Sequence, residues 1–222
     1  MRAVDELCEL LQCHATRDKV VYLTCYTLKL WGSTARSEPL LAASARLAAA
    51  RATMRLFDDA TALKTLIKYG LGKQDGPLWG AVGVCNSLFT LAYLQAEKIA
   101  WLIDTGVLAV SKETEFNVKT AHKLFWSLYS FAAFLRSIRA LHIAAQELKS
   151  PKRRKCSAAR FRHASLAASK LLLDVTHTVS WLPRGWLWGG RLSAQHASAA
   201  ASAAGVLGLV LHYQVKRLAT SR

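Results

Sequence analysis

The stretch PLWGAVGVCNSLFTLAYLQA, residues 77–96, contains no formally charged side chain. An α-helix of about 20 apolar residues is long enough to cross the hydrocarbon core of a bilayer. Residues 192–215 form a second run without Asp, Glu, Lys or Arg, and it ends at Lys216 and Arg217. Most of the remaining chain has the period of helices. We therefore expect an all-α, multi-helix integral membrane protein with amphipathic helices and about two transmembrane helices, with residues 192–215 as the terminal one.

The first transmembrane helix has two candidate positions. Hydropathy favours residues 77–96. Residues 122–143 are also apolar, but they are free of charge only between Lys123 and Arg136, which is about 18 Å of helix at ~1.5 Å per residue. An arginine at the centre of a bilayer costs roughly 3 kcal/mol, so Arg136 would have to snorkel or face protein. Both positions stay open on these grounds.

Composition limits the number of domains and the class of partner. The chain has 222 residues, which suits one domain over residues 1–222. Its 30 Lys and Arg against 14 Asp and Glu give a formal net charge of +16. Such an excess implies an anionic partner, either nucleic acid or an anionic phospholipid membrane. Nucleic-acid binding would leave residues 192–215 without a purpose, so we expect the membrane and no nucleic acid.

A basic amphipathic helix is predicted over residues 40–69. Apolar residues recur there at spacings of three and four, which places them on one helical face. Arginines flank this apolar stripe, and glycines in the sequence YGLG predict the end of the helix at about residue 70. The candidate membrane-binding residues of this segment are Leu40, Leu47, Arg51, Met54, Arg55 and Phe57.

A second candidate membrane-binding segment is SWLPRGWLWGGR, residues 180–191, which contains three of the seven tryptophans of the chain. Tryptophan and arginine side chains collect in the headgroup zone of bilayers. A basic loop, predicted over residues 149–163, precedes this segment by one helix. We expect the turn to anchor at the membrane surface through Trp181, Arg184, Trp186 and Trp188.

Signals for catalysis are weak. The sequence GLGKQDG, residues 70–76, looks superficially like a phosphate loop, but it follows a helix and lacks Ser or Thr after Lys73. Asp58 and Asp59 are adjacent on a predicted helix, so their carboxylates point about 100° apart. The histidines have no HxxxH or HExxH spacing. We therefore expect no enzymatic activity, no cofactor and no metal site.

Four blocks along the chain carry a resemblance to a known family. They are TRDKVVYLTCYTLKL (16–30), MRLFDDATALKTLIKYGLG (54–72), AEKIAWLIDTGVL (96–108) and SWLPRGWLWGGR (180–191). In this order they resemble the peroxisomal membrane protein 11 family, and the second and fourth blocks are most similar to its gamma type.

The resemblance implies a multi-pass protein of the peroxisomal membrane with both termini toward the cytosol. It implies two spans, one of them at residues 122–143 by family practice. It also implies homo-oligomers, hetero-oligomers with other family members, and promotion of membrane elongation, proliferation and fission of peroxisomes. The expected partners are a tail-anchored fission receptor and a dynamin-related GTPase.

Two mechanisms fit these expectations. Insertion of the 40–69 helix into one leaflet would expand that leaflet and favour positive curvature. The alternative is a pore or metabolite channel, which would explain Asn86, Arg136 and Arg139 at membrane depth. For self-association, the Ala201–Gly205 spacing is the small-residue pattern of closely packed membrane helices, although an alanine-rich composition explains it about as well.

Overall fold

The computed structural model describes residue 8, residues 10–149 and residues 154–220. All regular structure in this part of the chain is helical, and the expected all-α class is confirmed. The helices are α2 (His14–Ala35), α3 (Glu38–Met54), α4 (Asp59–Tyr69), the short 3-10 helix η1 (Lys73–Asp75), α5 (Pro77–Asp104), α6 (Lys112–Lys149), α7 (Arg154–Ser180) and α8 (Ala194–Thr220).

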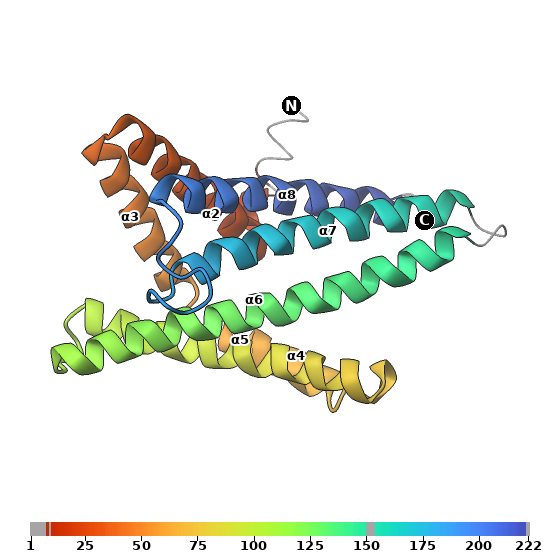
Figure 1. Cartoon of the computed structure of the whole chain (residues 1–222), viewed down its shortest axis with the longest axis horizontal. Helices are drawn as coiled ribbons and strands as arrows, with labels where there is room; N and C mark the ends of the chain where they lie inside the picture. Colours follow the sequence, from red (N-terminus) through yellow and green to blue (C-terminus); the bar gives the residue numbers. More distant parts are fainter. Residues whose placement is uncertain (1–7, 9, 150–153, 221–222) are drawn as a thin grey trace.

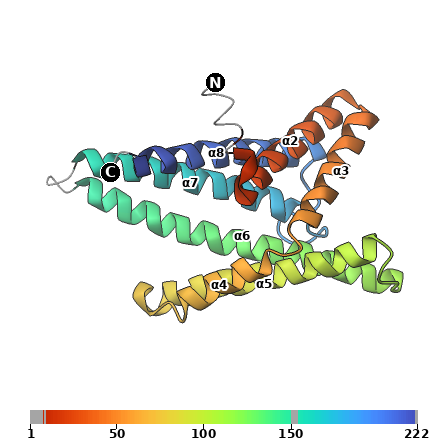
Figure 2. The same cartoon turned by 180° about the vertical axis from the view of Figure 1, so that it is seen from behind.

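The helices form a nearly closed series of neighbours. α4 packs on α5, α5 on α6, α6 on α7, α7 on α8, α8 on α2 and α2 on α3. A smaller contact between α3 and α5 closes the series, so the molecule has an interior that helices from α2 to α8 surround. Figures 1 and 2 show α4, α5 and α6 as one layer and α2, α3, α7 and α8 as the other.

Two described helices are long and apolar enough to cross a membrane, namely α5 and the Ala194–Val215 part of α8. α5 contains residues 77–96 and begins at Pro77, whose fixed backbone angle suits the first turn of a helix. Residues 122–143 lie inside α6, which does not meet the same criterion. Length and composition therefore favour α5 as the first candidate span.

The prediction of one helix over residues 40–69 is wrong. α3 ends at Met54, residues 55–58 form turns, and α4 begins at Asp59. The backbone amides of Leu56 and Asp58 bond three residues back, to Thr53 and Arg55, at 3.3 and 3.1 Å. This break turns the chain so that α4 runs along α5. The predicted stop is confirmed, because α4 ends at Tyr69 and is followed by Gly70, which has a φ of 60°.

The basic segment is not a loop over residues 149–163. α6 continues to Lys149 and α7 begins at Arg154, so residues 154–163 are helical, whereas residues 150–153 lie outside the described part of the chain. Alanine and arginine are strong helix formers, which explains why this stretch extends α7. Arg160 pairs with Glu147 of α6 at 3.1 Å and joins the two helices near their turn.

Small residues let α8 approach α2 closely. Ala201 and Ala204 are fully buried, and a Cβ atom on Gly205 would lie 3.1 to 3.3 Å from Leu23 of α2. The Ala201–Gly205 pattern therefore serves packing within one chain. A Cβ atom on Gly208, one turn further along α8, would meet only the Lys170 side chain, at 3.9 Å.

These two glycines give a matched test of the α2–α8 packing. Alanine is a better helix former than glycine by about 1 kcal/mol, so Gly208→Ala should raise the thermal unfolding midpoint in detergent. Gly205→Ala forces Leu23 to move, and it should be less stable than Gly208→Ala by about 1 to 3 kcal/mol. Equal midpoints for the two variants would contradict the close approach of α2 and α8.

Candidate functional site

The α4 surface carries large apolar side chains that no other part of the described chain covers. We use this name for α4 with its flanking residues Phe57 and Leu71, which are 84% and 75% exposed. On α4 itself Ile67 is 71% exposed, and the exposed Lys64 and Lys68 lie beside it. An exposed apolar stripe bordered by lysines is the pattern of a helix that lies in a membrane interface.

The predicted residues on α3 lie differently. Leu40, Leu47 and Met54 are half-buried, and α3 packs on α2. Of the candidates between residues 40 and 57, only Phe57 is exposed. The apolar stripe of α3 is therefore used largely for packing, and the exposed apolar surface begins at the turn that follows α3.

Arg51 points into the molecule. Its guanidinium donates to both carboxylate oxygens of Asp18 in α2, at 2.9 and 3.1 Å, and lies over the ring of Tyr22. Burial of the Asp18 carboxyl would raise its pKa, but the hydrogen bonds and charge of Arg51 outweigh burial and hold that pKa below its usual range. In this arrangement Arg51 links α3 to α2 and is not available to lipid headgroups.

Arg55 also points inward and forms the contact between α3 and α5. Its guanidinium pairs with the Glu97 carboxylate of α5, which also accepts a hydrogen bond from Tyr93 at 3.0 Å. His122 of α6 lies 3.6 Å from the same carboxylate. The carboxylate of Glu97 thus joins α3, α5 and α6 at one point.

The membrane-binding role that the sequence predicts for residues on α3, at the following turn and in the tryptophan turn stays a prediction.

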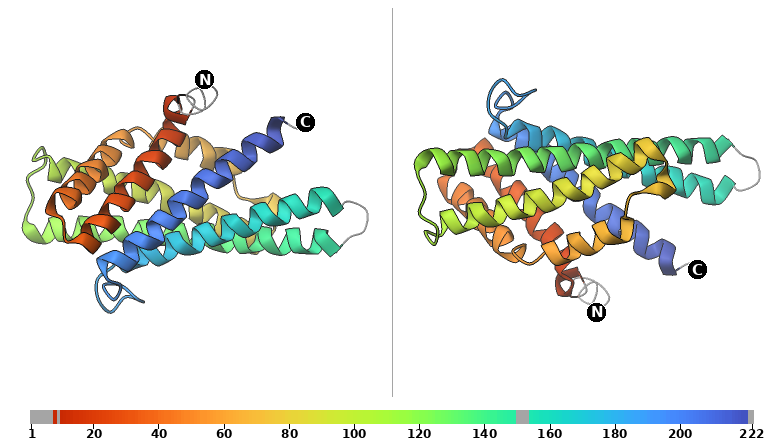
Figure 3. Two further views of the ribbon diagram at one scale, coloured as in Figure 1. Left: turned by 90° about the horizontal axis from the view of Figure 1, so that it is seen from above. Right: turned by 90° about the horizontal axis from the view of Figure 1, so that it is seen from below.

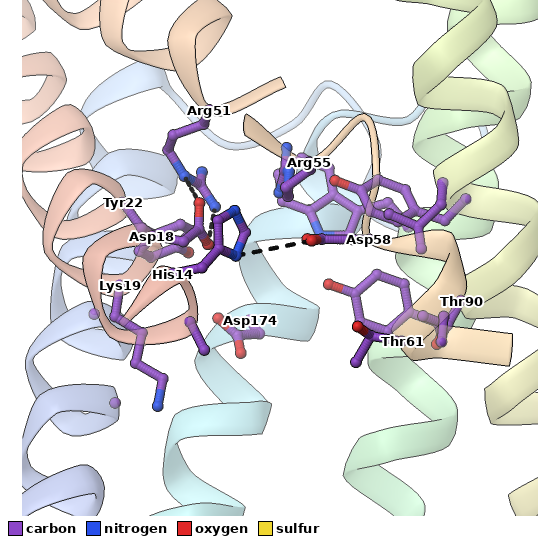
Figure 4. A pocket seen from close by; sticks show the side chains of 18 of the residues that line it. His14, Asp18, Lys19, Tyr22, Arg51, Arg55, Asp58, Thr61, Thr90 and Asp174 are labelled. Atoms are coloured by element: carbon purple, nitrogen blue, oxygen red, sulfur yellow. Dashed lines mark hydrogen bonds and ion pairs between the residues drawn. The ribbon is translucent and has the colours of Figure 1, made fainter. Parts of the chain in front are cut away.

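A cavity of about 700 Å³ lies inside the series of helices (Figure 4). Asp18 and Arg51 form one wall of the cavity, and two further ion pairs lie around it. They are His14 with Asp58 at 3.8 Å and Lys170 with Asp174 at 2.6 Å. The cavity therefore has a charged lining in which these acids are paired with bases. The described residues contain no group of three or more His, Cys, Asp or Glu that could hold a metal ion.

A small set of contacts, which we call the clamp, fixes the end of α4 to α5 and α6. The Tyr69 hydroxyl donates to Asp75 at 2.7 Å, and Arg139 of α6 donates to the same carboxylate at 2.9 Å. The Arg139 guanidinium also lies over the ring of Trp79. The Tyr69 ring covers Gly83, where a Cβ atom would lie only 2.1 Å from the tyrosine oxygen. Sequence analysis missed the clamp, since its members are spread over three helices and a turn.

The tryptophan turn is only partly exposed. The Trp188 indole donates to the carbonyl of Thr176 at 3.0 Å, and the ammonium of Lys29 lies 3.9 Å from the centre of the Trp181 ring. Trp186 is 46% exposed, and Arg184 is exposed as well. Of the predicted anchors, Trp186 and Arg184 can therefore meet lipid, whereas Trp181 and Trp188 mainly hold the turn in place.

His177 of α7 lies at the centre of this packing and is fully buried. Its Nδ1 lies 2.8 Å from the carbonyl of Ala197 and its Nε2 lies 3.3 Å from the Trp181 indole nitrogen. A carbonyl only accepts and an indole only donates, so the ring is neutral with its proton on Nδ1. Tyr26 of α2 and Trp126 of α6 contact the same ring edge to face.

The fold and these surfaces define a helical membrane protein with two candidate spans, an exposed amphipathic helix and an interior held by ion pairs. Residues 4–211 match the family described as Peroxisomal biogenesis factor 11 (PEX11), and the chain belongs to that family. It is a peroxisomal membrane protein by this membership. No solved structure matches it.

Curated relatives agree with this membership. Human peroxisomal membrane protein 11C is 30% identical over 211 residues, which cover 86% of each chain. The mouse protein of the same name is 29% identical over 213 residues, again 86% of each chain. The expected family is therefore confirmed.

Substitution tests the packing around His177. His177→Gln loses the edge-to-face ring contacts with Tyr26 and Trp126, and aromatic pairs of this kind contribute roughly 0.5 to 1.5 kcal/mol each. The variant should therefore have a lower thermal unfolding midpoint in detergent. An unchanged midpoint would count against this packing.

Proposed function

We propose that this protein shapes the peroxisomal membrane by inserting the α4 surface into one leaflet, and thereby promotes elongation, proliferation and fission of peroxisomes. The observation that carries the proposal is the exposure of Phe57, Ile67 and Leu71 around a short basic helix. Membership of the family and the two candidate spans agree with a role in peroxisome proliferation.

The energies are adequate for such a role. Burying a large apolar side chain in lipid contributes roughly 1.5 to 3 kcal/mol, and each lysine beside an anionic surface adds about 1 kcal/mol. Several apolar residues and two lysines therefore supply enough free energy to hold α4 in the headgroup region. A helix there occupies area in one leaflet only, which favours positive curvature.

Insertion requires that α4 leave α5. In the described arrangement α4 runs beside this candidate span, from a Lys98–Asp59 ion pair of 2.6 Å to the contact of Tyr69 with Gly83. Exposed lysines on α4 would then lie beside the middle of a membrane-spanning helix, where charge is costly. No residue of α4 is fully buried, so its docking rests on few contacts. The proposal thus includes undocking of α4 at the membrane.

The proposal also includes the expectations that rest on family membership. They are termini toward the cytosol, homo-oligomers and hetero-oligomers with other family members, and recruitment of a tail-anchored fission receptor and a dynamin-related GTPase. Membrane shaping by many copies agrees with self-association, because one wedge bends a membrane only locally.

We rank the pore or metabolite channel second. The residues that favoured it are engaged with other groups in the described chain. Arg139 belongs to the clamp, and Arg136 lies over the Tyr69 ring, 3.5 Å from the side-chain oxygen of Asn86. These contacts give the two arginines partners within the protein, so their occurrence in an apolar helix does not require a conducting path.

Placing acids on the α4 surface tests the wedge. Phe57→Glu with Ile67→Glu changes two exposed side chains, so folding should survive. The substitutions remove apolar burial and add repulsion from anionic lipid, which should weaken α4 insertion by more than about 3 kcal/mol, or more than about a hundredfold. The full chain, reconstituted in anionic vesicles, should lose tubule formation in electron micrographs, and peroxisomes carrying it should stay short.

The matched control is Thr61→Glu with Thr65→Glu. It adds the same charge at two exposed polar positions of α4 that line the cavity and do not lie on the side of Ile67. This control should keep most of the tubule formation. Normal tubules from a well-expressed Phe57→Glu, Ile67→Glu protein would refute the wedge and bring the channel forward.

Weakening the clamp should have the opposite effect. Asp75→Asn removes the charge that Arg139 and Tyr69 share, so α4 should undock more readily and tubulate vesicles at a severalfold lower protein density, as expected for a loss of about 1 kcal/mol. The readout is the threshold protein-to-lipid ratio. Asp104→Asn, which removes an exposed acid paired with Lys119, is the control and should not shift the threshold. Equal thresholds for the two variants would show that docking does not limit insertion.

A further inference from the structure

α6 presents no exposed charge over a length that matches a bilayer. Between Ala121 and Leu141 the exposed residues are Phe131, Ile138 and Ala140, and all three are apolar. This part of the helix is about 30 Å long at ~1.5 Å per residue, close to the thickness of a hydrocarbon core. Hydropathy alone does not reveal it, because the charged residues of the same stretch lower the average.

α7 shows the same property. Between Ala164 and Trp181 only Ser169 and Leu172 are exposed, and neither carries a charge. The length is about 27 Å at ~1.5 Å per residue. Together with α5 and α8, these stretches form an uncharged belt around four helices. α4, with its exposed lysines, lies outside this belt and belongs at the surface under the proposed function.

Lys123 lies near one end of the α6 stretch, and the other charges within the belt have partners inside the protein. Arg136 reaches Asn86, and Arg139 is held in the clamp. Lys170 and Asp174 of α7 pair with each other at 2.6 Å. Ionisable residues at membrane depth occur mostly where they pair with one another and face the bundle interior, as these do.

The packing supplies an independent argument. The two candidate spans, α5 and α8, do not contact each other, whereas α6 packs on α5 and α7, and α7 packs on α8. If α5 and α8 cross the membrane in this arrangement, α6 and α7 lie at the same depth. Moving α6 and α7 together to one side of the membrane would break the α5–α6 contact, which is the largest helix contact of the fold, and the α7–α8 contact.

Basic residues lie at one end of the helix bundle. The first turn of α5, the carboxyl-terminal end of α6, the start of α7 and the carboxyl-terminal end of α8 lie at one end of the molecule (Figure 3). Arg160 and Arg162, both exposed, lie in the first turns of α7 near that end. Short basic segments stay on the cytosolic side of membranes.

We propose that the α6–α7 hairpin crosses the same bilayer as α5 and α8, with its uncharged belt against the acyl chains. The basic α6–α7 turn then faces the compartment that the carboxyl terminus faces. A chain crossing only through α5 and α8 would place this turn on the opposite side. The inference concerns topology and does not depend on whether α4 bends the membrane.

Sites for a sequence-specific protease test the inference in the full-length protein. One site is inserted between Lys149 and Arg154, a second after Gly106 in the α5–α6 turn, and a third before a carboxyl-terminal tag, each in a separate variant. The protease is added outside sealed peroxisomes, with detergent-treated samples as the cleavage control. Only variants that reach peroxisomes and resist carbonate extraction are compared.

We expect cleavage at the α6–α7 site and at the tag, and protection at the Gly106 site. Any result in which the first two sites behave alike and the Gly106 site differs supports the four crossings, even if the orientation is reversed. Protection of the α6–α7 site together with cleavage at the tag overturns the inference, and so does cleavage at all three sites.

Cysteine labelling gives a second measurement that needs no insertion. In a chain whose native cysteines are replaced by serine, Arg160→Cys and Leu172→Cys place thiols on the same helix at two exposed positions. In sealed peroxisomes a membrane-impermeant maleimide should label position 172 at least about tenfold more slowly than position 160, because the first lies within lipid. Equally rapid labelling of the two positions would overturn the inference.

Discussion

The pairing of the Arg55 guanidinium with the Glu97 carboxylate is the interaction on which the rest of the structure depends. It closes the series of helices at the contact between α3 and α5, where the fold has its smallest helix interface. Two charges withdrawn from water lose hydration, and Tyr93 and His122 beside the carboxylate replace part of that loss. Loss of one partner would leave the other charge buried, which typically costs 3 to 5 kcal/mol.

The Arg55–Glu97 pair also determines where α4 lies relative to the series of helices. Because Arg55 turns inward, the chain leaves α3 through the turns at residues 55–58 and lays α4 against the outside of α5. Phe57 falls on the outer side of this turn and is exposed. A basic, amphipathic helix is thus carried by a rigid bundle but is not part of its core. Contacts at its two ends, Asp59 with Lys98 and Tyr69 with Gly83, keep it in register.

Much of this fold was predictable from the sequence, and the failures have physical causes. Uncharged runs and glycine stops act locally, so the candidate span in α8, one of the two positions considered for the first span and the end of α4 could be predicted. The break after α3 was missed because its cause is a partner of Arg55 that lies 42 residues away in the sequence. The partner of Arg51 lies 33 residues away, which is why a buried arginine was assigned to the membrane surface. The internal contacts of Trp181 and Trp188 were missed for a related reason, since they depend on how α7 meets α2 and the turn.

The weak docking of α4 sets a threshold for the proposed activity. A segment that binds lipid only when it is free has an apparent affinity reduced by the fraction of time it is free. Flat, tightly packed or weakly anionic membranes would then fail to capture α4, whereas a membrane with packing defects would capture it and become more curved. Each captured copy would create more defects for its neighbours. A curved region would in this way favour the insertion of further copies of α4. Tubules would then start at a few places on an organelle instead of spreading over its whole surface.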